Sequence, residues 1–427
     1  MSSPTVIAPP VPVLAPPYDT GARVALQTEA RRFSDEEVRP VADELDRHKG
    51  EMPRSLIEKL GKQGYFGILI PTEYGGMGLG VFEYCLIAEE LARGWMSVAS
   101  IIARAQGMGT GFDDGARRRR LLEKSARGEW IGAAALSEPG AGSDLAGVST
   151  RAVRDGDHFV VTGTKRWCGN AKAADFIQLL CRVRDPEPGE RRSAGMGTLV
   201  VEKEPGAFPE GLTGTPIDKI GYHGFLTWNL EFDGLRVPVA NLVADLGRAR
   251  AGGKDEDEDE GKVKVKDKGK DANTFRAIEQ GLNAARVHTA ARAVGLARAA
   301  VEECLLYLQE RHQFDRPIGD FQALRFMAAE MAARVDQARA FYQQVAHLID
   351  LGRPCEREAA MAKLLATEMA VEVTGQAMQL HGGNGYTTER RVERYWRDAR
   401  LTTVFEGTSQ IQQKIISDRL LPRSPLC

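Results

Sequence analysis

One carboxylate near the C-terminal end of the chain stands in a setting that could support chemistry. Glu406 follows the apolar residues Val404 and Phe405 and precedes a glycine. Apolar neighbours would desolvate the carboxylate, raise its pKa and make it a better base. Thr408 or Ser409 could cap a helix that begins directly afterwards. At this level a plain first-turn glutamate, favoured by the helix dipole, is the better explanation of the pattern.

Two stretches upstream combine small residues with hydroxyls and an indole. Residues 136–144 read Leu-Ser-Glu-Pro-Gly-Ala-Gly-Ser-Asp, in which small residues let main-chain N–H groups approach an anionic group and Ser137 and Ser143 add hydroxyls. Residues 165–170 read Lys-Arg-Trp-Cys-Gly-Asn, and the indole of Trp167 could cover a planar cofactor. A tight turn and a core tryptophan are the plainer interpretations of the two stretches.

The elements that must position these residues change character along the chain. From about Gly21 to Glu129 the hydrophobic spacing predicts helices, including an amphipathic one through Phe33 and Leu45. After residue 131, short β-type runs at 158–164, 176–180, 197–202 and 226–232 indicate a small antiparallel barrel or sandwich. Steady three- and four-residue steps then predict long helices over 282–311, 324–348 and 356–379, with a last one after Glu406.

The expected fold class is therefore α+β, in five consecutive parts. These are a disordered extension (1–20), an N-terminal α domain (21–130), a middle β domain (131–247), a charged flexible insertion (248–271) and a C-terminal four-helix bundle (272–427). The insertion has an acidic block at 255–260 followed by alternating lysines, and such charge blocks cannot offset chain entropy by burial.

Composition excludes several classes of function. With 57 Lys and Arg against 59 Asp and Glu, the chain lacks the basic field that a nucleic-acid binder needs. No apolar run approaches the roughly 18–20 residues that span a bilayer, and the first 17 residues lack the basic residues of a signal peptide or presequence. Six cysteines without paired spacing suit reduced thiols better than disulfides or a zinc site. The expected location is cytoplasmic, with no metal, membrane or nucleic-acid partner.

Five motifs in a fixed order give the chain a specific resemblance. They are residues 136–144, residues 165–170, Glu-Arg-His-Gln-Phe (310–314) with Phe321-Gln322, Gln-Leu-His-Gly-Gly-Asn-Gly-Tyr (379–386), and Arg-Asp-Ala (397–399) leading to Phe-Glu-Gly-Thr (405–408). With these motifs the chain resembles the acyl-CoA dehydrogenase family of FAD-dependent enzymes, from about Gly21 to Leu421. The family's fold is the same α, β, α order that the hydrophobic patterns indicate.

The resemblance implies two sets of FAD contacts. One set matches positions around the flavin ring and phosphates: Leu136, Ser137, Gly142, Ser143, Trp167, Cys168, Gly169, Thr408 and Gln410. The other matches positions that hold FAD across a subunit interface: Arg311, Gln313, Phe314, Phe321, Gln322, Gln379, Gly382 and Gly383. The second set implies a homotetramer built as a dimer of dimers. Positions near the substrate match Ser143, Asn283, Arg286 and Gly407.

The resemblance also implies a mechanism in which Glu406 is the catalytic base. Glu406 would remove the α-proton of an acyl-CoA or acyl-carrier thioester while the β-hydride passes to flavin N5, giving a trans-2-enoyl thioester. The main-chain N–H of Glu406 and a flavin ribityl hydroxyl would hold the thioester carbonyl, and electrons would pass to an electron-transfer flavoprotein. Some members carry the base on the preceding helix, where this chain has Ala285.

Two departures from the family pattern and two alternative functions stay open. Gly169 stands where many relatives have Ser or Thr near flavin N5, and Gly-Tyr-His-Gly (221–224) replaces a common Gly-x-Arg-x-Ser pattern. A flavin oxidase or monooxygenase of the same fold that uses O₂, or a non-catalytic FAD-binding relative, are the alternatives. The length and branching of the acyl chain cannot be predicted from these motifs.

Overall fold

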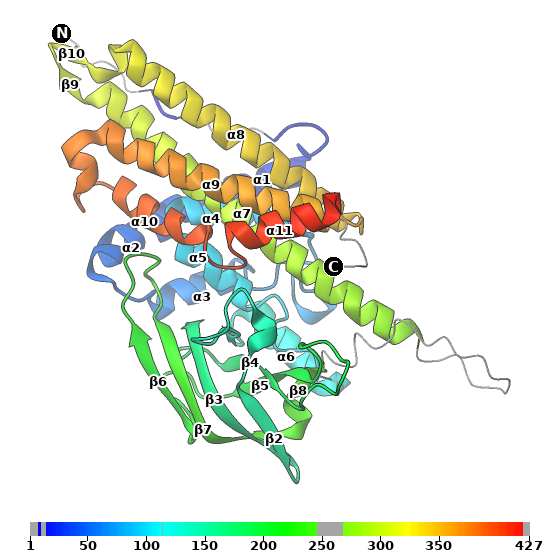
Figure 1. Cartoon of the computed structure of the whole chain (residues 1–427). Helices are drawn as coiled ribbons and strands as arrows, with labels where there is room; N and C mark the ends of the chain where they lie inside the picture. Colours follow the sequence, from blue (N-terminus) through cyan, green and yellow to red (C-terminus); the bar gives the residue numbers. More distant parts are fainter. Residues whose placement is uncertain (1–6, 10–13, 113, 246–267, 422–427) are drawn as a thin grey trace.

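The computed structural model describes residues 7–9, 14–112, 114–245 and 268–421, and it has the predicted order of helices, sheet and helices (Figure 1). Residues 248–267 of the predicted charged insertion lie outside the described residues. Part of the predicted disordered extension is packed instead. Leu14 is buried in the core of the bundle, and the Tyr18 ring lies 5.0 Å from the Phe82 ring. These apolar side chains have a surface to bury against, which the extension's composition alone did not show.

The N-terminal part is a cluster of helices around the buried helix α4. The helix predicted around 33–45 begins earlier, at Gly21, where the Thr20 hydroxyl accepts a hydrogen bond from the Arg23 N–H. The α-helices are α1 (Gly21–Phe33), α2 (Arg39–Leu45), α3 (Arg54–Lys62), α4 (Val81–Gly94), α5 (Met96–Ile101) and α6 (Gly115–Arg127), with a π-helical turn η1 (Ser34–Val38) and 3₁₀ turns η2 (Asp46–His48), η3 (Thr72–Tyr74) and η4 (Ile102–Arg104).

The middle part is an eight-stranded sheet that is mostly antiparallel. Its strands are β1 (Gly132–Ala135), β2 (Arg151–Asp155), β3 (His158–Gly169), β4 (Phe176–Arg182), β5 (Met196–Glu202), β6 (Leu212–Ile217), β7 (Thr227–Pro238) and β8 (Leu242–Asp245). The order is β6-β7-β3-β2-β4-β5-β8, with β1 paired to β4. The pairings β1–β4 and β2–β4 are parallel, and the latter is a single residue pair, so two antiparallel halves meet there. The predicted runs correspond to β3, β4, β5 and β7.

The C-terminal part is a helical bundle with α7 at its centre, packed against α4, α8 and α9 (Figure 1). Its elements are α7 (Lys268–Glu310), β9 (His312–Gln313), β10 (Arg316–Pro317), η8 (Ile318–Asp320), α8 (Gln322–Asp350), α9 (Glu356–His381), η9 (Gly382–Tyr386), α10 (Val392–Thr402) and α11 (Ser409–Leu420). The short α10 and α11 flank Glu406 and place it beside the middle of α7.

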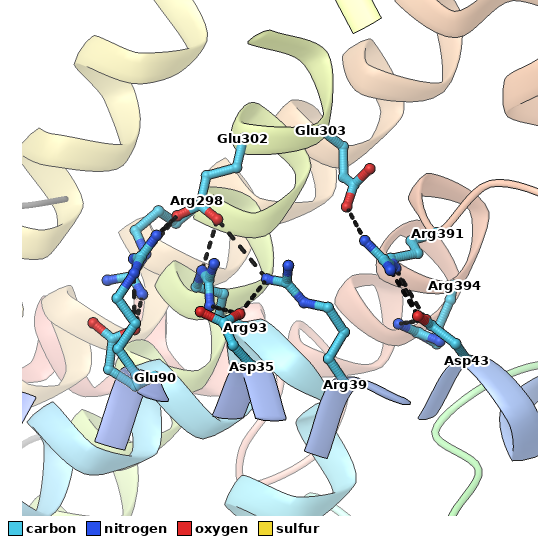
Figure 2. Close-up of polar contacts among 11 residues, drawn as sticks. Asp35, Arg39, Asp43, Glu90, Arg93, Arg298, Glu302, Glu303, Arg391 and Arg394 are labelled. Atoms are coloured by element: carbon cyan, nitrogen blue, oxygen red, sulfur yellow. Dashed lines mark hydrogen bonds and ion pairs between the residues drawn. The ribbon is translucent and has the colours of Figure 1, made fainter. Parts of the chain in front are cut away.

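Buried ion pairs fix the N-terminal helices to this bundle (Figure 2). Arg298 of α7 pairs with Glu89 and Glu90 of α4, and Arg93 Nε lies 2.7 Å from Glu302 Oε2. Charged groups in a low-dielectric contact need their partners, because an unpaired buried charge is strongly destabilising. The pairs therefore specify how α4 and α7 face one another, which sets the position of the residues that α7 presents to Glu406.

Candidate active site

Glu406 occupies a sharp turn between α10 and α11. Its φ is +52°, and the next residue, Gly407, has φ +89°. A side chain other than Asn or Asp is uncommon in the left-handed region, and such conformations persist where the surroundings hold them. Thr408 accepts a hydrogen bond from the Ile411 N–H at 3.2 Å and so caps α11, as predicted. The turn orients the Glu406 side chain toward α7.

Two side chains of α7 hold the Glu406 carboxylate. Arg292 Nη2 donates to Oε1 at 2.7 Å, and the Thr289 hydroxyl donates to Oε2. Arg292 is almost fully buried, whereas the Glu406 side chain stays 37% exposed on its other side. Arg292 is held in turn by the Ser100 hydroxyl, which accepts from Nη1 at 2.7 Å. The carboxylate is thus fixed on the protein side and accessible on the opposite side.

The predicted upward shift of the Glu406 pKa is wrong. Burial raises the pKa, but the charge of Arg292, the hydrogen bonds from Thr289 and Arg292, and the charge of Lys363 outweigh it, so the pKa lies below its ordinary value. In addition, Val404 is half exposed and only Phe405 packs inward, its ring 5.8 Å from that of Tyr222. The carboxylate is therefore ionised at neutral pH, as a base must be.

Buried polar side chains also hold the turn itself. Lys363 of α9 donates to the Gly407 carbonyl at 2.7 Å, and Gln412 Nε2 donates to the same oxygen at 3.0 Å. Burial lowers the pKa of Lys363 to about 8. Both side chains are fully buried beneath the turn. They satisfy a carbonyl that the strained turn would otherwise leave unpaired.

The substrate-side residues predicted on α7 lie on one face of that helix. Asn283 is buried and accepts a hydrogen bond from Arg286 Nη1 at 2.8 Å. Nine residues at about 100° each place Arg292 on the side of α7 opposite Asn283, whereas Thr289 and Arg292, three residues apart, share the side that contacts Glu406. Arg292, which contacts the carboxylate directly, was not singled out from the sequence. Its role depends on how α7 faces the turn of Glu406, which the spacing of residues along the sequence does not show.

The predicted glycine-rich loop is fastened to the sheet by a buried ion pair. Glu138 Oε1 lies 2.9 Å from Lys165 Nζ and also accepts from the Thr150 N–H, while Oε2 accepts from the N–H and hydroxyl of Ser149. Burial raises the pKa of Glu138, but these hydrogen bonds lower it to about 2. Lys165 donates further to the Leu136 carbonyl at 2.9 Å. Glu138 thus has a structural task within the motif.

The outer side of this loop fits a planar, partly anionic cofactor. The Arg166 N–H donates to the Ser137 carbonyl at 2.8 Å, which places the exposed side chains of Leu136 and Trp167 on adjoining segments. A Cβ added at Gly140 or Gly142 would meet no atom within 4 Å, so the main chain there is open to close approach. Ser143 is exposed. These residues would hold FAD through apolar ring contacts and main-chain N–H groups.

Cys168 and Gly169 contribute differently from Trp167. The Cys168 side chain is fully buried in the core of the sheet, so only its main chain could face a cofactor. Gly169 does not have a positive φ, but a Cβ added there would lie 2.7 Å from Arg104 Nη2. The glycine thus leaves room for a guanidinium.

The unusual Gly221–Gly224 segment is tied to the motif that precedes Glu406. The Tyr222 N–H donates to Asp398 Oδ1 at 2.5 Å, and Arg397 Nη1 donates to the Ile220 carbonyl at 3.1 Å. Burial and the neighbouring Asp46 raise the pKa of Asp398 to about 7. This contact brings the Tyr222 ring against Phe405, so two motifs far apart in sequence form one wall beside the base.

The second predicted set of FAD contacts lies at the far end of the bundle. Arg311, Gln313, Phe314 and Gln322 are exposed around the β9–β10 hairpin, with Phe321 partly covered. Gln379, Gly382 and Gly383 line a surface hollow of about 510 Å³ with Tyr386 and Trp396. In Figure 1 this end lies well away from the sheet that carries Trp167. One chain therefore does not bring the two predicted sets together.

Further features of the described residues bear on function. No described helix combines the length and apolar composition needed to cross a membrane. The described part of the chain has no group of three or more His, Cys, Asp or Glu side chains able to hold a metal ion. Its five cysteines are buried free thiols.

Family models for the three acyl-CoA dehydrogenase domains together match most of the chain. The N-terminal domain model matches residues 20–129, the middle domain 133–235 and the C-terminal domain 275–421. The chain is 35% identical to (2S)-methylsuccinyl-CoA dehydrogenase of Cereibacter sphaeroides over 405 residues, covering 93% of this chain and 69% of that protein. It is 32% identical to the mitochondrial short-chain specific acyl-CoA dehydrogenase of Rattus norvegicus, covering 93% and 89%.

A solved structure is similar over nearly its full length. It comes from a study of the electron transferring flavoprotein of Acidaminococcus fermentans and flavin-based electron bifurcation. The TM-score is 0.81 at 32% sequence identity, with 95% of this chain and 99% of that chain covered.

Proposed function

This chain belongs to the acyl-CoA dehydrogenase family, whose members are FAD-dependent oxidoreductases acting on CH–CH bonds, and we propose that it oxidises an acyl-CoA to the trans-2-enoyl-CoA with Glu406 as the base. The observation that carries the proposal is the fixed Glu406 carboxylate, bonded to Arg292 and Thr289 on one side and accessible on the other. Bound FAD would supply the two-electron acceptor for the β-hydride.

The turn around Glu406 can serve both the proton and the carbonyl of a thioester. Among the described residues, the Glu406 main-chain N–H takes part in no hydrogen bond. A free N–H beside the base suits the thioester oxygen, because charge builds on that oxygen as the α-proton leaves. Lys363 and Gln412 keep the turn rigid through the Gly407 carbonyl. We assign Glu406 to the proton and its own N–H to the oxygen.

FAD would lie between two chains in this proposal. The loop at Ser137, Gly142 and Ser143, with Leu136 and Trp167, would hold the ring side of FAD, and Thr408 and Gln410 are proposed as further FAD contacts from the family resemblance. The hairpin and hollow at the far bundle end would receive FAD from a neighbouring subunit. The separation of the two sets within one chain favours this arrangement.

An electron-transfer flavoprotein is the proposed acceptor, supported by the family resemblance and by the similarity to the Acidaminococcus fermentans structure. Peroxide yield during turnover without an added acceptor distinguishes this proposal from an O₂ oxidase. We expect less than about one peroxide per ten flavins reduced. Stoichiometric peroxide would replace the dehydrogenase assignment by an oxidase.

The base assignment is tested by anaerobic flavin bleaching in Glu406→Gln. With a panel of saturated acyl-CoAs from four to eight carbons, we expect the bleaching rate to fall at least about a thousandfold, since the position where some relatives carry the base is Ala285 in this chain. FAD content and the spectral change on binding enoyl-CoA should be unchanged. Glu356→Gln is a matched control, because Glu356 also pairs with an arginine, Arg419, but at the surface. Bleaching by Glu406→Gln at the wild-type rate would disprove the assignment.

A further inference from the structure

Arg104 is a half-buried cation that has no anionic partner among the described residues. It ends the 3₁₀ turn η4, and its Cζ lies 5.0 Å from the centre of the Phe225 ring. Within the described residues Arg104 takes part in no ion pair and no hydrogen bond, and its Nε is buried. Lys219 Nζ lies 5.2 Å from the same ring and donates only to the carbonyls of Tyr222 and Phe225. Two cations thus share one aromatic ring without a carboxylate between them.

This cation is linked to the turn of the proposed base through neighbouring side chains. Ser100, which holds Arg292, precedes Arg104 by one helical turn, or about 6 Å along the axis. On the other side, the Phe225 ring contacts Tyr222 at 4.9 Å, and Tyr222 contacts Phe405 at 5.8 Å. Arg104 is therefore connected to the turn of Glu406 through two independent sets of contacts.

Gly169 makes room for the guanidinium. A Cβ at this position would lie 2.7 Å from Arg104 Nη2, and the backbone of Gly169 does not itself require glycine. Replacing a hydroxyl-bearing residue by glycine here admits a fixed positive charge. The sequence departure at Gly169 and the unpaired arginine are thus two aspects of one feature.

A desolvated guanidinium without a partner is costly, and a planar carboxylate satisfies it with two parallel hydrogen bonds. In coenzyme A the phosphates are separated from the thioester by the whole pantetheine arm. A carboxylate on the acyl group, unlike those phosphates, lies close enough to the thioester to be a partner for Arg104.

We propose that Arg104 binds a second carboxylate on the acyl chain, so that the preferred substrates are thioesters of short dicarboxylic acids. This inference rests on the proposed function and specifies its substrate class. Lys219, which lies near the same Phe225 ring, adds positive potential. Neutral acyl thioesters remain substrates, but they leave Arg104 unsatisfied.

The test compares glutaryl-CoA with its neutral isostere, 5-methylhexanoyl-CoA, in anaerobic bleaching of the holoenzyme. We expect the wild-type enzyme to favour glutaryl-CoA in kcat/KM by about ten- to hundredfold. Arg104→Gln should lose that preference, mainly because its kcat/KM for glutaryl-CoA falls. Arg104→Lys should retain part of the preference. Arg119→Gln is the matched control, since Arg119 also lies over an aromatic ring, Tyr74, but outside the site.

A binding measurement keeps the inference separate from the proposed function. Calorimetric Kd values of the oxidised holoenzyme for glutaconyl-CoA and 5-methyl-2-hexenoyl-CoA should show the same preference and the same loss in Arg104→Gln. If neither saturated thioester bleaches the flavin, the proposed function fails. The Kd values then still show whether Arg104 binds the carboxylate of the ligand. Equal Kd values in the wild type, or an equal loss for both ligands with a changed flavin potential in Arg104→Gln, would overturn the role given to Arg104.

Discussion

At the scale of single residues, Glu406 meets two demands that oppose one another. A base must be ionised, which Arg292 and Thr289 ensure, and it must be basic, which the same contacts reduce. A ligand that displaces water from the accessible side of Glu406 would strengthen the effect of burial. The ion pair with Arg292 therefore determines the pKa of Glu406 before substrate binds, and substrate binding should raise that pKa.

Arg292→Gln should move the pH dependence of flavin bleaching upward. Burial raises the pKa of Glu406 and Arg292 lowers it. Removing the arginine leaves burial dominant, so the folded-state pKa rises and the ionised base forms only at higher pH. Bleaching rates measured between pH 5 and 9 should show the rising limb displaced by at least about one pH unit.

Thr289→Val should displace the limb in the same direction by less, because it removes one hydrogen bond and no charge. Arg292→Lys should restore most of the wild-type profile by returning the charge. A limb that stays in place in Arg292→Gln would show that the ion pair does not tune the base.

The residues around Glu406 differ in how far the sequence predicted them. Glu406 and Gly407 were identified because their motif is local and contiguous. Arg292 and Arg104 were not, because their roles depend on which helix faces which. The orientation of the helices depends on contacts such as Arg93–Glu302 between α4 and α7, and the spacing of residues along one sequence does not reveal such contacts. The pKa of Glu406 is lowered and not raised as predicted for the same reason, because the lowering comes from Arg292 and Thr289 on a facing helix.

At the scale of elements, the ion pair of Glu138 and Lys165 joins a loop to a strand. Lys165 lies in β3, and Glu138 lies in the loop that carries the proposed FAD contacts Ser137 and Ser143. Both side chains are buried, so neither charge is satisfied by water when the other is removed. The pair should therefore contribute to stability as well as to the shape of the loop.

Glu138→Gln should destabilise the protein in a pH-dependent way. The folded-state pKa of Glu138 is about 2, against 4.5 for the free side chain. The stabilisation is complete above about pH 4.5 and is lost as pH falls toward 2, a difference of about 3 kcal/mol. Thermal midpoints of wild type and variant should differ most at pH 7 and converge as pH falls toward 2. A constant difference would mean that the carboxylate charge is not involved.

Long and strongly periodic elements were predicted better than short ones. The steps along α8 and the alternation in β7 are both confirmed, because each element buries one continuous face. Strands β1 and β8 are four residues long, and β1 is mostly alanine, so neither has a detectable period. Helix α6 is dominated by arginine and has few apolar positions. Their positions are determined by pairing partners elsewhere in the chain.

At the scale of the whole molecule, the exposed apolar side chains at the far end of the bundle need a covering surface. Phe314 and Tyr386 are 86% and 87% exposed. Phe314 sits at the tip of the β9–β10 hairpin with φ +53°, beside Asp315 at +63°. Residues this apolar are rarely left in water as a group on a monomer. A second copy that supplies FAD and its own surface would cover them, as the tetramer implied by the family resemblance requires.

Phe314→Asp should therefore dissociate the assembly and release FAD together. Aspartate tolerates the left-handed backbone of the hairpin tip, so the local fold should survive while the apolar contact becomes charged. Losing one buried Phe contact per subunit costs about 1.5–3 kcal/mol, before the cost of burying a carboxylate. Sedimentation velocity should show a tetramer for the wild type and smaller species for the variant, with most of the flavin absorbance lost.

Val153→Asp provides the control, since Val153 is 61% exposed on β2 and lies in no predicted contact. It should remain tetrameric and keep its flavin. A Phe314→Asp variant that stays tetrameric with full flavin would place the subunit interface elsewhere. A variant that dissociates but keeps its flavin would contradict only the shared FAD site, because it would show that one chain holds the cofactor without its neighbour.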